Sequence, residues 1–230
     1  AKKHNLFVIE DTAQAIGADF TDKSGNTKKA GTIGEIGCTS FFPSKNLGCY
    51  GDGGALFTNN DKLAESISSI VNHGMKIRYY HDVIGVNSRL DTIQAVILNA
   101  KLKHLDQYNI ARREAADFYD KAFINCEKII TPKRFSKSTH TFHQYTVITK
   151  NIDRIKLQNH LKEKGIASAI YYPLPLHSQK AFQQFSYDEN AFPVTNKLCE
   201  TVFSLPINTE LNQEILKYIT DSVLEFIKNN

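Results

Sequence analysis

The 230-residue sequence has one methionine, four cysteines and no apolar stretch that approaches membrane-spanning length. The cysteines (Cys38, Cys49, Cys126 and Cys199) are widely spaced and form no Cys-x-x-Cys pair. This spacing argues against a disulfide framework and favours reduced thiols in a cytoplasmic protein. No signal-peptide pattern opens the sequence, so we expect neither secretion nor a membrane partner.

The sequence also lacks a strong charge of either sign. It carries 28 basic and 24 acidic residues, a formal net charge of +4, and its lysines are scattered. Short basic pairs such as Lys28-Lys29 and Arg112-Arg113 are better interpreted as solvated faces than as a nucleic-acid footprint. There are no internal repeats or low-complexity segments. Apolar and charged fractions of 41% and 23% are those of an ordinary globular protein with a sizeable core.

Lys45 has an unusual environment for a lysine. It follows Phe41, Phe42 and Pro43 and precedes Gly48, and the nearest acid in the segment is Asp52. Desolvation disfavours the ammonium form, which makes such an amine a nucleophile for carbonyl carbons. The segment therefore indicates a Schiff-base lysine; the alternative is a loop lysine whose neighbours are merely packed.

A second segment supports the interpretation of Lys45 as a Schiff-base lysine. The apolar run Leu6 to Ile9 predicts a buried strand that delivers Asp11 and Gln14 at its carboxyl end, where open α/β sheets place ligands. Pyridoxal phosphate needs a lysine, a carboxylate for its pyridine nitrogen, and hydroxyl or backbone donors for its phosphate. The commoner role of an acid after a strand, a turn or N-cap, stays open for Asp11.

Two further motifs, a histidine pair and a glycine-rich run, have features of ligand sites. The spacing His140-x-x-His143 is compatible with a metal pair, but in a strand the two side chains would point to opposite faces and no third ligand is near. The glycine-rich run from Gly48 to Gly54 has neither the Rossmann nor the Walker spacing. We expect no metal site, and a tight turn at the glycines that lets the backbone approach a cofactor.

Several longer phrases resemble the DegT/DnrJ/EryC1/StrS family of pyridoxal-phosphate-dependent aminotransferases, which act on nucleotide-linked keto sugars. The resemblance runs in order through essentially the whole chain. Its phrases are Val8-Ile9-Glu10-Asp11-Thr12-Ala13-Gln14-Ala15, Ser40-Phe41-Phe42-Pro43-Ser44-Lys45-Asn46-Leu47-Gly48, Gly85-Val86-Asn87-Ser88-Arg89-Leu90-Asp91, His140-Thr141-Phe142-His143-Gln144-Tyr145, Tyr172-Pro173-Leu174-Pro175-Leu176-His177 and Ser204-Leu205-Pro206.

The resemblance implies how the cofactor, pyridoxal 5'-phosphate, would be held. Lys45 would carry it as a Schiff base and shuttle the proton. Asp11 would pair with the pyridinium nitrogen, Gln14 would contact the ring hydroxyl oxygen, and Ser40 would bind the phosphate. Asn87 would reach the phosphate in the neighbouring subunit, so the resemblance implies a homodimer with shared active sites.

The resemblance also implies the substrate side. Arg89 would contact an anionic substrate group across the interface, and His177 and His140 would line the substrate. The implied reaction is transamination of a nucleotide-linked keto sugar, UDP-linked and with L-glutamate as donor, for surface polysaccharide or related biosynthesis. The phrases look closest to relatives that aminate UDP-linked 3-keto-N-acetylhexosaminuronates. Family members that are dehydratases replace the lysine, so the presence of Lys45 favours amination.

The implied fold is the α/β fold type I of pyridoxal-phosphate-dependent transferases, similar to aspartate aminotransferase. Family members carry a large segment upstream of the Asp11 strand. The sequence begins at Ala1 and its one methionine is Met75, so we expect residues 1–106 to be the C-terminal part of an incomplete large domain. Residues 107–230 would form a connecting helix and a small α/β domain. The alternative function is that of a catalytically inactive truncated homologue that acts as a dimerisation or scaffold partner.

Periodicity and capping signals predict the elements of both regions. In residues 90–105 an apolar stripe of Ile93, Val96, Ile97, Ala100, Leu102 and Leu105 predicts an amphipathic helix. The remaining predicted strands are 6–10, 17–20, 37–41, 54–58, 142–148 and 167–172, and the remaining predicted helices are 61–72, 107–123, 154–164 and 211–227.

Overall fold

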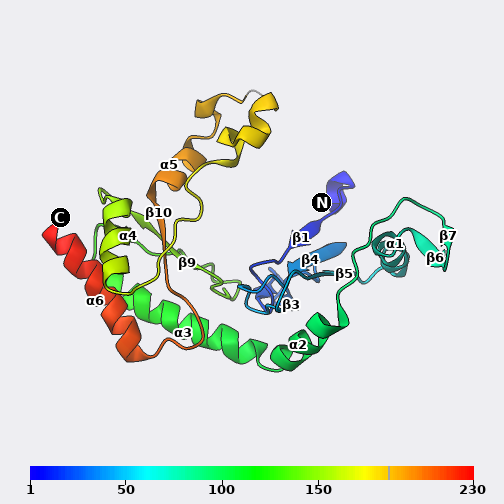
Figure 1. Ribbon diagram of the computed structural model, residues 1–230, viewed down its shortest axis with the longest axis horizontal. Helices are drawn as coiled ribbons and strands as arrows, with labels where there is room; N and C mark the ends of the chain where they lie inside the picture. The colour runs from blue at the N-terminus through cyan, green and yellow to red at the C-terminus, as the bar shows by residue number, and fades with distance from the viewer. Residues whose placement is uncertain (186) are drawn as a thin grey trace. The chain divides into compact units, whose positions relative to one another are not determined.

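The computed structural model describes residues 1–185 and 187–230, which divide into two compact units. The first comprises Ala1–Ile110 and Phe135–His143, and the second Ala111–Arg134 and Gln144–Asn230. Helix α3 (Leu105–Phe123) begins in the first unit and ends in the second (Figure 1). Within the residues described, no helix is long and apolar enough to cross a membrane.

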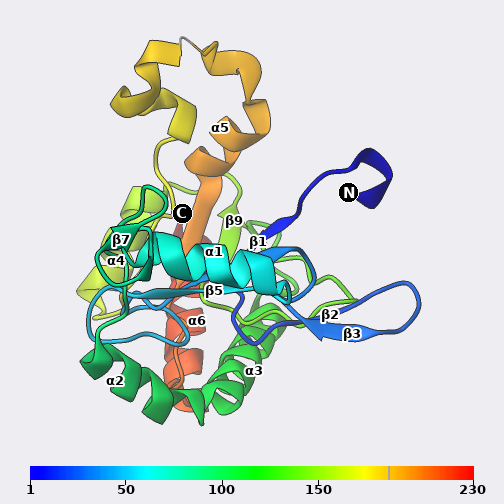
Figure 2. The ribbon, with the colours of Figure 1, turned by 90° about the vertical axis from the view of Figure 1, so that its right-hand side faces the viewer.

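The first unit is built on a three-stranded mixed sheet in the order β1-β4-β5. Strand β1 (Ile9–Asp11) pairs parallel with β4 (Ile36–Ser40), with Asp11 opposite Cys38, and β5 (Gly54–Phe57) pairs antiparallel with β4. Strands β2 (Asp19–Thr21) and β3 (Thr27–Lys29) form a separate hairpin (Figure 2). A short 3-10 helix, η1 (Lys2–His4), precedes the sheet.

The prediction that the first strand is buried is wrong for this structure. Leu6, Phe7 and Ile9 are 61%, 83% and 68% exposed. Their sequence pattern is that of a strand covered on both faces, but no element among the described residues packs over it closely enough to bury these side chains. The apolar run therefore predicted a strand here, but the observed strand covers only Ile9–Asp11, and its surroundings were predicted incorrectly.

Helix α1 (Asp61–Val71) begins where its capping signal predicts. The side-chain oxygen of Asn60 accepts hydrogen bonds from the backbone N–H groups of Lys62 and Leu63. The helix ends at Val71, and Gly74 adopts a positive φ of 75° just beyond it. Strands β6 (Met75–Ile77) and β7 (Tyr80–His81) then form a short hairpin.

Helix α2 (Thr92–Leu102) lies where expected, but its predicted apolar stripe is not its buried face. Ile93 and Val96 are 74% and 65% exposed, whereas Leu98 is buried. The inward face combines Leu98 with the polar side chains of Gln94 and Lys101, which hydrogen-bond to the loop after Lys45. The hydrophobic pattern did not predict this orientation of α2, because two of the inward-facing residues are polar.

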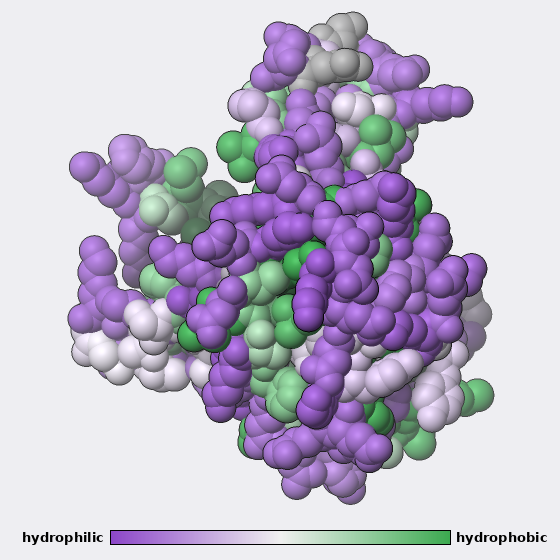
Figure 3. Space-filling model, turned by 90° about the vertical axis from the view of Figure 1, so that its left-hand side faces the viewer, coloured by the Kyte–Doolittle hydropathy of each residue, from purple (hydrophilic) through white to green (hydrophobic). Residues whose placement is uncertain are grey.

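The second unit is an antiparallel sheet packed with helices. Its order is β10-β9-β8, formed by β8 (Ile129–Ile130), β9 (Tyr145–Thr149) and β10 (Val202–Leu205). The helices are α4 (Arg154–Glu163), α5 (Pro193–Thr201) and α6 (Gln213–Asn229), with 3-10 turns η2 (Leu176–Ser178), η3 (Lys180–Phe185) and η4 (Glu189–Ala191). On the face shown in Figure 3, small hydrophobic patches lie among hydrophilic side chains.

The core of this unit is built from alternate residues of β9 and one stripe each of α3, α4 and α6. Its members are Ala115, Tyr119, Phe123, Tyr145, Val147, Leu157, Leu161, Phe203, Leu216, Ile219 and Val223. The buried Tyr145 hydroxyl donates to Asp120 over 2.6 Å, and Arg134 bonds both Asp117 and Asp120. Burial raises the pKa of Tyr145, so its hydroxyl stays a donor at all ordinary pH values.

Of two strand predictions in this part of the chain, 142–148 begins three residues too early and 167–172 is wrong. Strand β9 begins at Tyr145 rather than Phe142, because Phe142 has a left-handed φ of 44° and its N–H donates to His140 Nδ1. His140 and His143 therefore do not lie in a strand, and the expectation that their side chains point to opposite faces loses its basis. In 167–172 the only pairing of described residues is a bridge from Ala169 to Ser204.

Leu157 provides a test of this core. It is fully buried in α4, whereas Ile155 in the same helix is 57% exposed. We expect Leu157→Ala to lower the free energy of unfolding by about 3 kcal/mol, because it removes buried methyl groups and leaves a cavity. Urea denaturation followed by circular dichroism measures this. Ile155→Ala is the control, expected within about 0.5 kcal/mol of the unsubstituted chain; equal losses in the two variants would contradict the packing described.

Candidate active site

Four of the site residues predicted from the sequence, Asp11, Gln14, Ser40 and Lys45, lie at or just beyond one edge of the first unit's sheet. Because β1 and β4 run parallel, their last residues, Asp11 and Ser40, lie at the same edge. Gln14 and Lys45 follow in the loops that leave this edge. The register is held by cross-links between the two strand ends: the Thr12 hydroxyl donates to Cys38 O over 2.8 Å, and the Thr39 hydroxyl to Thr12 O over 3.2 Å.

Asp11 has a structural role in the turn after β1: its Oδ1 accepts the N–H of Ala13 over 2.9 Å. This bond occupies one oxygen of an exposed carboxylate at the strand's carboxyl end. The turn role and the proposed pairing with a ring nitrogen are therefore compatible, since a carboxylate has two oxygens and about four acceptor positions.

Lys45 lies in a tight turn after β4. Its N–H donates to Phe42 O over 2.8 Å with Pro43 inside the turn, and the N–H of Phe42 donates to Ser40 Oγ over 3.2 Å. The Lys45 side chain is half-buried. Gly48 closes the turn against its start: a Cβ at this position would lie 2.4 Å from Pro43 O, so only glycine fits.

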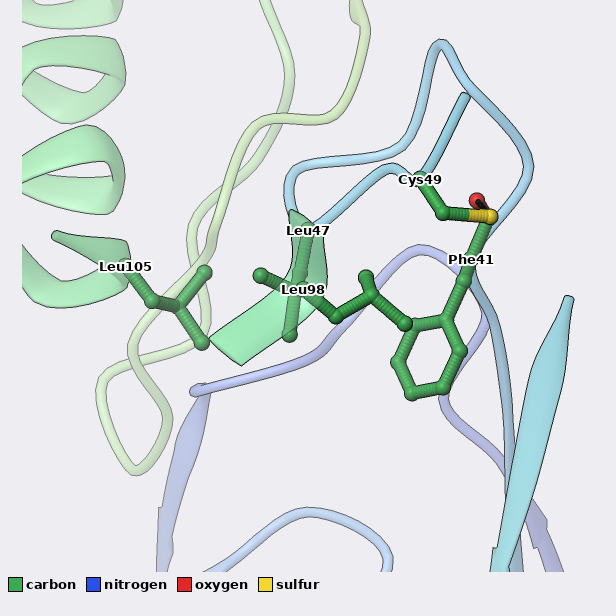
Figure 4. Close-up of a cluster of buried hydrophobic side chains, with 5 residues drawn as sticks. All are labelled: Phe41, Leu47, Cys49, Leu98 and Leu105. Carbon is green, nitrogen blue, oxygen red and sulfur yellow. Dashed lines mark hydrogen bonds between the residues drawn. The ribbon is translucent and has the colours of Figure 1, made fainter. Parts of the chain in front are cut away.

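The turn is held on a small apolar cluster. Phe41, Leu47 and Cys49 from the lysine loop pack with Leu98 of α2 and Leu105 of α3 (Figure 4). The Cys49 sulfur lies 3.0 Å from Phe41 O and 2.8 Å from Gly51 O, and its single S–H donates to one of these carbonyls. A buried thiol bonded to backbone carbonyls is a structural group.

Two residues of α2 that the sequence analysis overlooked clamp the same loop. Gln94 Oε1 accepts the N–H of Tyr50 over 2.7 Å. The Lys101 amine donates to Gly48 O over 2.7 Å and lies 4.8 Å from the centre of the Tyr50 ring. Their position on an otherwise apolar face of a predicted helix is the one signal that could have marked them.

The remaining predicted residues are divided between the units. Asn87 and Arg89 are exposed in the segment after β7. Asn87 forms an isolated antiparallel β-bridge with Asn72, and the Arg89 guanidinium donates to Asn72 Oδ1 over 2.7 Å. His140 is in the first unit, its ring 4.2 Å from that of Phe142, and His177 is in the second. Over residues 1–185 and 187–230, no group of three or more metal-ligating side chains is placed to hold a metal.

Glu10, next to Asp11, is a third residue that the sequence analysis missed. Its carboxylate accepts backbone N–H groups from Gly31 (2.9 Å), Ile33 (2.6 Å) and Gly34 (2.7 Å). Partial burial alone would raise the pKa of Glu10, but the three N–H donors together lower it below its ordinary value. Glu10 thereby fixes the 31–34 loop to β1.

Comparison with known proteins identifies the family. The DegT/DnrJ/EryC1/StrS aminotransferase family model matches residues 1–224. The chain belongs to this family. Its lysine loop and strand-end carboxylate are thus features of a DegT/DnrJ/EryC1/StrS protein, and the α/β fold type I expected from the resemblance is confirmed by solved family structures.

Curated relatives match over nearly the whole chain. The "Pleiotropic regulatory protein" of Geobacillus stearothermophilus is 45% identical over 100% of this chain and 60% of its own length. The UDP-N-acetyl-3-dehydro-alpha-D-glucosamine 3-aminotransferase of Acidithiobacillus ferrooxidans is 45% identical over 93% of this chain and 55% of its own. The UDP-2-acetamido-2-deoxy-3-oxo-D-glucuronate aminotransferase of Pseudomonas aeruginosa is 42% identical, over 95% and 58%.

Among solved structures, S. venezuelae DesV in complex with a ketimine intermediate is 35% identical with a TM-score of 0.90, covering 98% of this chain and 59% of that one. The chain therefore spans about three fifths of the length of the relatives it matches. Other relatives are named for dTDP- and GDP-linked sugars.

The lowered pKa of Glu10 predicts a pH-dependent stability. A carboxylate with a depressed folded-state pKa stabilises the fold above its unfolded-state pKa, and this contribution is lost as the pH falls through the folded-state value. We expect Glu10→Gln to lower the urea midpoint at neutral pH, and the difference from the unsubstituted chain to shrink as the pH falls from about 6 to about 3. Exposed Glu127→Gln is the control. A pH-independent effect of Glu10→Gln would contradict the prediction.

Proposed function

We propose that the protein transfers an amino group from an amino acid to a nucleotide-linked keto sugar, with pyridoxal 5'-phosphate held on Lys45. One observation carries the proposal: in a member of an aminotransferase family, the lysine, the strand-end carboxylate of Asp11 and the hydroxyl of Ser40 share one sheet edge. The free cysteines suit an enzyme of the cytoplasm.

The donor set fits this cofactor. It combines an amine, a carboxylate, a hydroxyl and an amide, from Lys45, Asp11, Ser40 and Gln14, and these match the aldehyde, ring nitrogen, phosphate and ring hydroxyl of pyridoxal phosphate. When bound, the cofactor supplies an electron sink that makes a proton next to the amine labile. The residues present therefore fit the group, and Asn87 of a second subunit would complete the phosphate contacts.

The chain's own residues supply the proton chemistry and the orientation. The Lys45 amine would accept the labile proton from the amino donor and return it to the sugar carbon, acting as general base and then general acid. The Asp11 carboxylate would keep the ring nitrogen protonated. The hydrogen bond from Ala13 and the strand-end position of Asp11 restrict the directions in which that carboxylate can point.

The substrate side is proposed from relatives and from charge. Two relatives above 40% identity are named for UDP-linked 3-keto sugars, which supports a UDP-linked substrate, with L-glutamate as amino donor and surface polysaccharide or related biosynthesis as the pathway class. Arg89, an exposed cation beside Asn87, would bind an anionic group of the substrate. His140 and His177 would line the sugar.

A second function has a specific observation in its favour. One relative at 45% identity is named for regulation rather than for catalysis, and Leu6, Phe7 and Ile9 of this chain are exposed. An inactive partner that docks on a second protein would use such apolar surface. The two functions differ in whether Lys45 reacts, which makes the lysine the point to test.

Lys45 is expected to be the site of cofactor attachment. Incubation with pyridoxal phosphate followed by borohydride should fix the cofactor on Lys45, located by peptide mass spectrometry, and Lys45→Ala should remove this adduct and abolish transamination of a UDP-linked keto sugar. Exposed Lys23→Ala is the matched control and should leave both unchanged. Undiminished adduct in Lys45→Ala would refute the attachment; absence of adduct in the unsubstituted chain would favour the regulatory partner.

Shared active sites predict complementation between defective subunits. Lys45→Ala and Asn87→Ala should each be inactive alone, because each dimer then lacks one component in both sites. Refolding the two together should restore about a quarter of the unsubstituted activity, since half of the dimers are mixed and each mixed dimer holds one intact site. A parallel mixture of Lys45→Ala with Asp11→Ala is the control. No recovery in the first mixture, or equal recovery in both, would exclude sites shared through Asn87.

A further inference from the structure

Directly after Lys45, the chain buries a polar side chain. Asn46 is 8% exposed, and its amide nitrogen donates to Asn109 Oδ1 over 2.8 Å and to Thr141 O over 2.9 Å. Asn109, on α3, is 2% exposed and donates from its own amide nitrogen to Ile16 O over 3.1 Å. Two buried amides thus form a directed chain from the lysine loop to the loop after β1.

The direction of this chain is fixed by its acceptors. Both partners of the Asn46 amide nitrogen are carbonyl oxygens, so a flipped amide would place oxygen against oxygen twice. Leaving a buried polar group without a hydrogen-bond partner costs more free energy than forming the hydrogen bond gains. The pair therefore favours one register of the lysine loop over all shifted ones.

The same series of hydrogen bonds includes Thr141, which contacts the loop that carries Gln14. The Thr141 hydroxyl donates to Gln14 O over 2.9 Å, so Thr141 and Asn109 hold the backbone of the loop after β1 at two points, Gln14 O and Ile16 O. Gly17 permits this close approach: its φ is 82°, and a Cβ there would lie 2.7 Å from Asn109 Nδ2.

We propose that the Asn46–Asn109 amide pair is a positioning device that sets Lys45 against the loop carrying Asp11 and Gln14. The inference rests on the proposed function for the reactivity of Lys45, and on the hydrogen bonds alone for the positioning. The apolar cluster under the loop is non-directional and tolerates sliding, whereas the amides specify one register. Asn46 and Asn109 act through the backbone of Lys45 and are not themselves catalytic.

Hydrogen exchange of the cofactor-free chain, followed by mass spectrometry, tests the positioning. We expect Asn46→Ala and Asn109→Ala each to speed exchange about tenfold at the amides of Lys45, Cys49, Ala15 and Ala18, and the double variant to add little, because each single change already breaks the chain. Thr149→Val, which removes a comparable buried hydroxyl bond in the second unit, is the control. Acceleration no greater than in the control, or additive effects, would overturn the proposal.

A selectivity readout separates positioning from stability. The ratio of borohydride-trapped cofactor on Lys45 to that on exposed Lys23 should fall about tenfold in Asn46→Ala and stay unchanged in Thr149→Val. If the unsubstituted chain shows no preference for Lys45, the proposed function fails, while the exchange result still decides the positioning. An unchanged ratio in Asn46→Ala beside a clear preference in the unsubstituted chain would overturn the inference.

A second substitution covers the case in which Asn46→Ala does not fold. Thr141→Val is nearly isosteric and removes only the hydroxyl donor to Gln14 O, whereas Thr141→Ser keeps it. Exchange at Ala15 should accelerate in Thr141→Val and return toward the unsubstituted rate in Thr141→Ser. Equal exchange in the two variants would show that Thr141 contributes packing alone and would remove the link to the Gln14 side.

Discussion

The parallel pairing of β1 with β4 is the constraint on which the candidate site depends. With Asp11 opposite Cys38, both strands end at one edge, and the loops that carry Gln14 and Lys45 leave from there. Side chains alternate between faces along a strand, so a shift of one residue would turn Asp11 to the opposite face and bring Glu10 to its place. The threonine cross-links at the strand ends oppose that shift, because each buried carbonyl would lose its donor.

The lysine loop is held by two kinds of interaction with different consequences. Three apolar side chains of the loop pack with one each from α2 and α3 and stabilise the loop by removing apolar surface from water. The bonds from Gln94, Lys101, Asn46 and Asn109 are individually modest, but they are directional, and the bond between Asn46 and Asn109 is buried. Because the function proposed for Lys45 requires its amine at one place, register matters here more than total stability, and the polar bonds set the register.

The sequence predicted elements where local signals dominate and failed where tertiary contacts decide. Helix α1 could be predicted because the Asn60 cap acts within one turn, and α3, α4 and α6 because their periodicity is long. The orientation of α2 could not be predicted, because the charged Lys101 faces inward, where its amine contacts a backbone carbonyl and a tyrosine ring. The Asn46–Asn109 contact joins residues 63 positions apart, and an asparagine alone gives no sign of such a partner. The family phrases named Lys45 and Asp11 as candidates, but they assigned no role to the side chains that hold these residues.

The adjacent acids Glu10 and Asp11 show how one strand can serve stability and chemistry together. Glu10 faces the 31–34 loop, and three backbone N–H groups occupy its carboxylate, leaving it little capacity to bind a ligand. Asp11 points to the other side at the strand end and accepts one backbone N–H. A carboxylate that pairs with a cofactor must keep an oxygen available and still be oriented. Of the two acids only Asp11 meets both conditions, so the strand's alternation gives Glu10 its structural role and leaves Asp11 for the pairing proposed above.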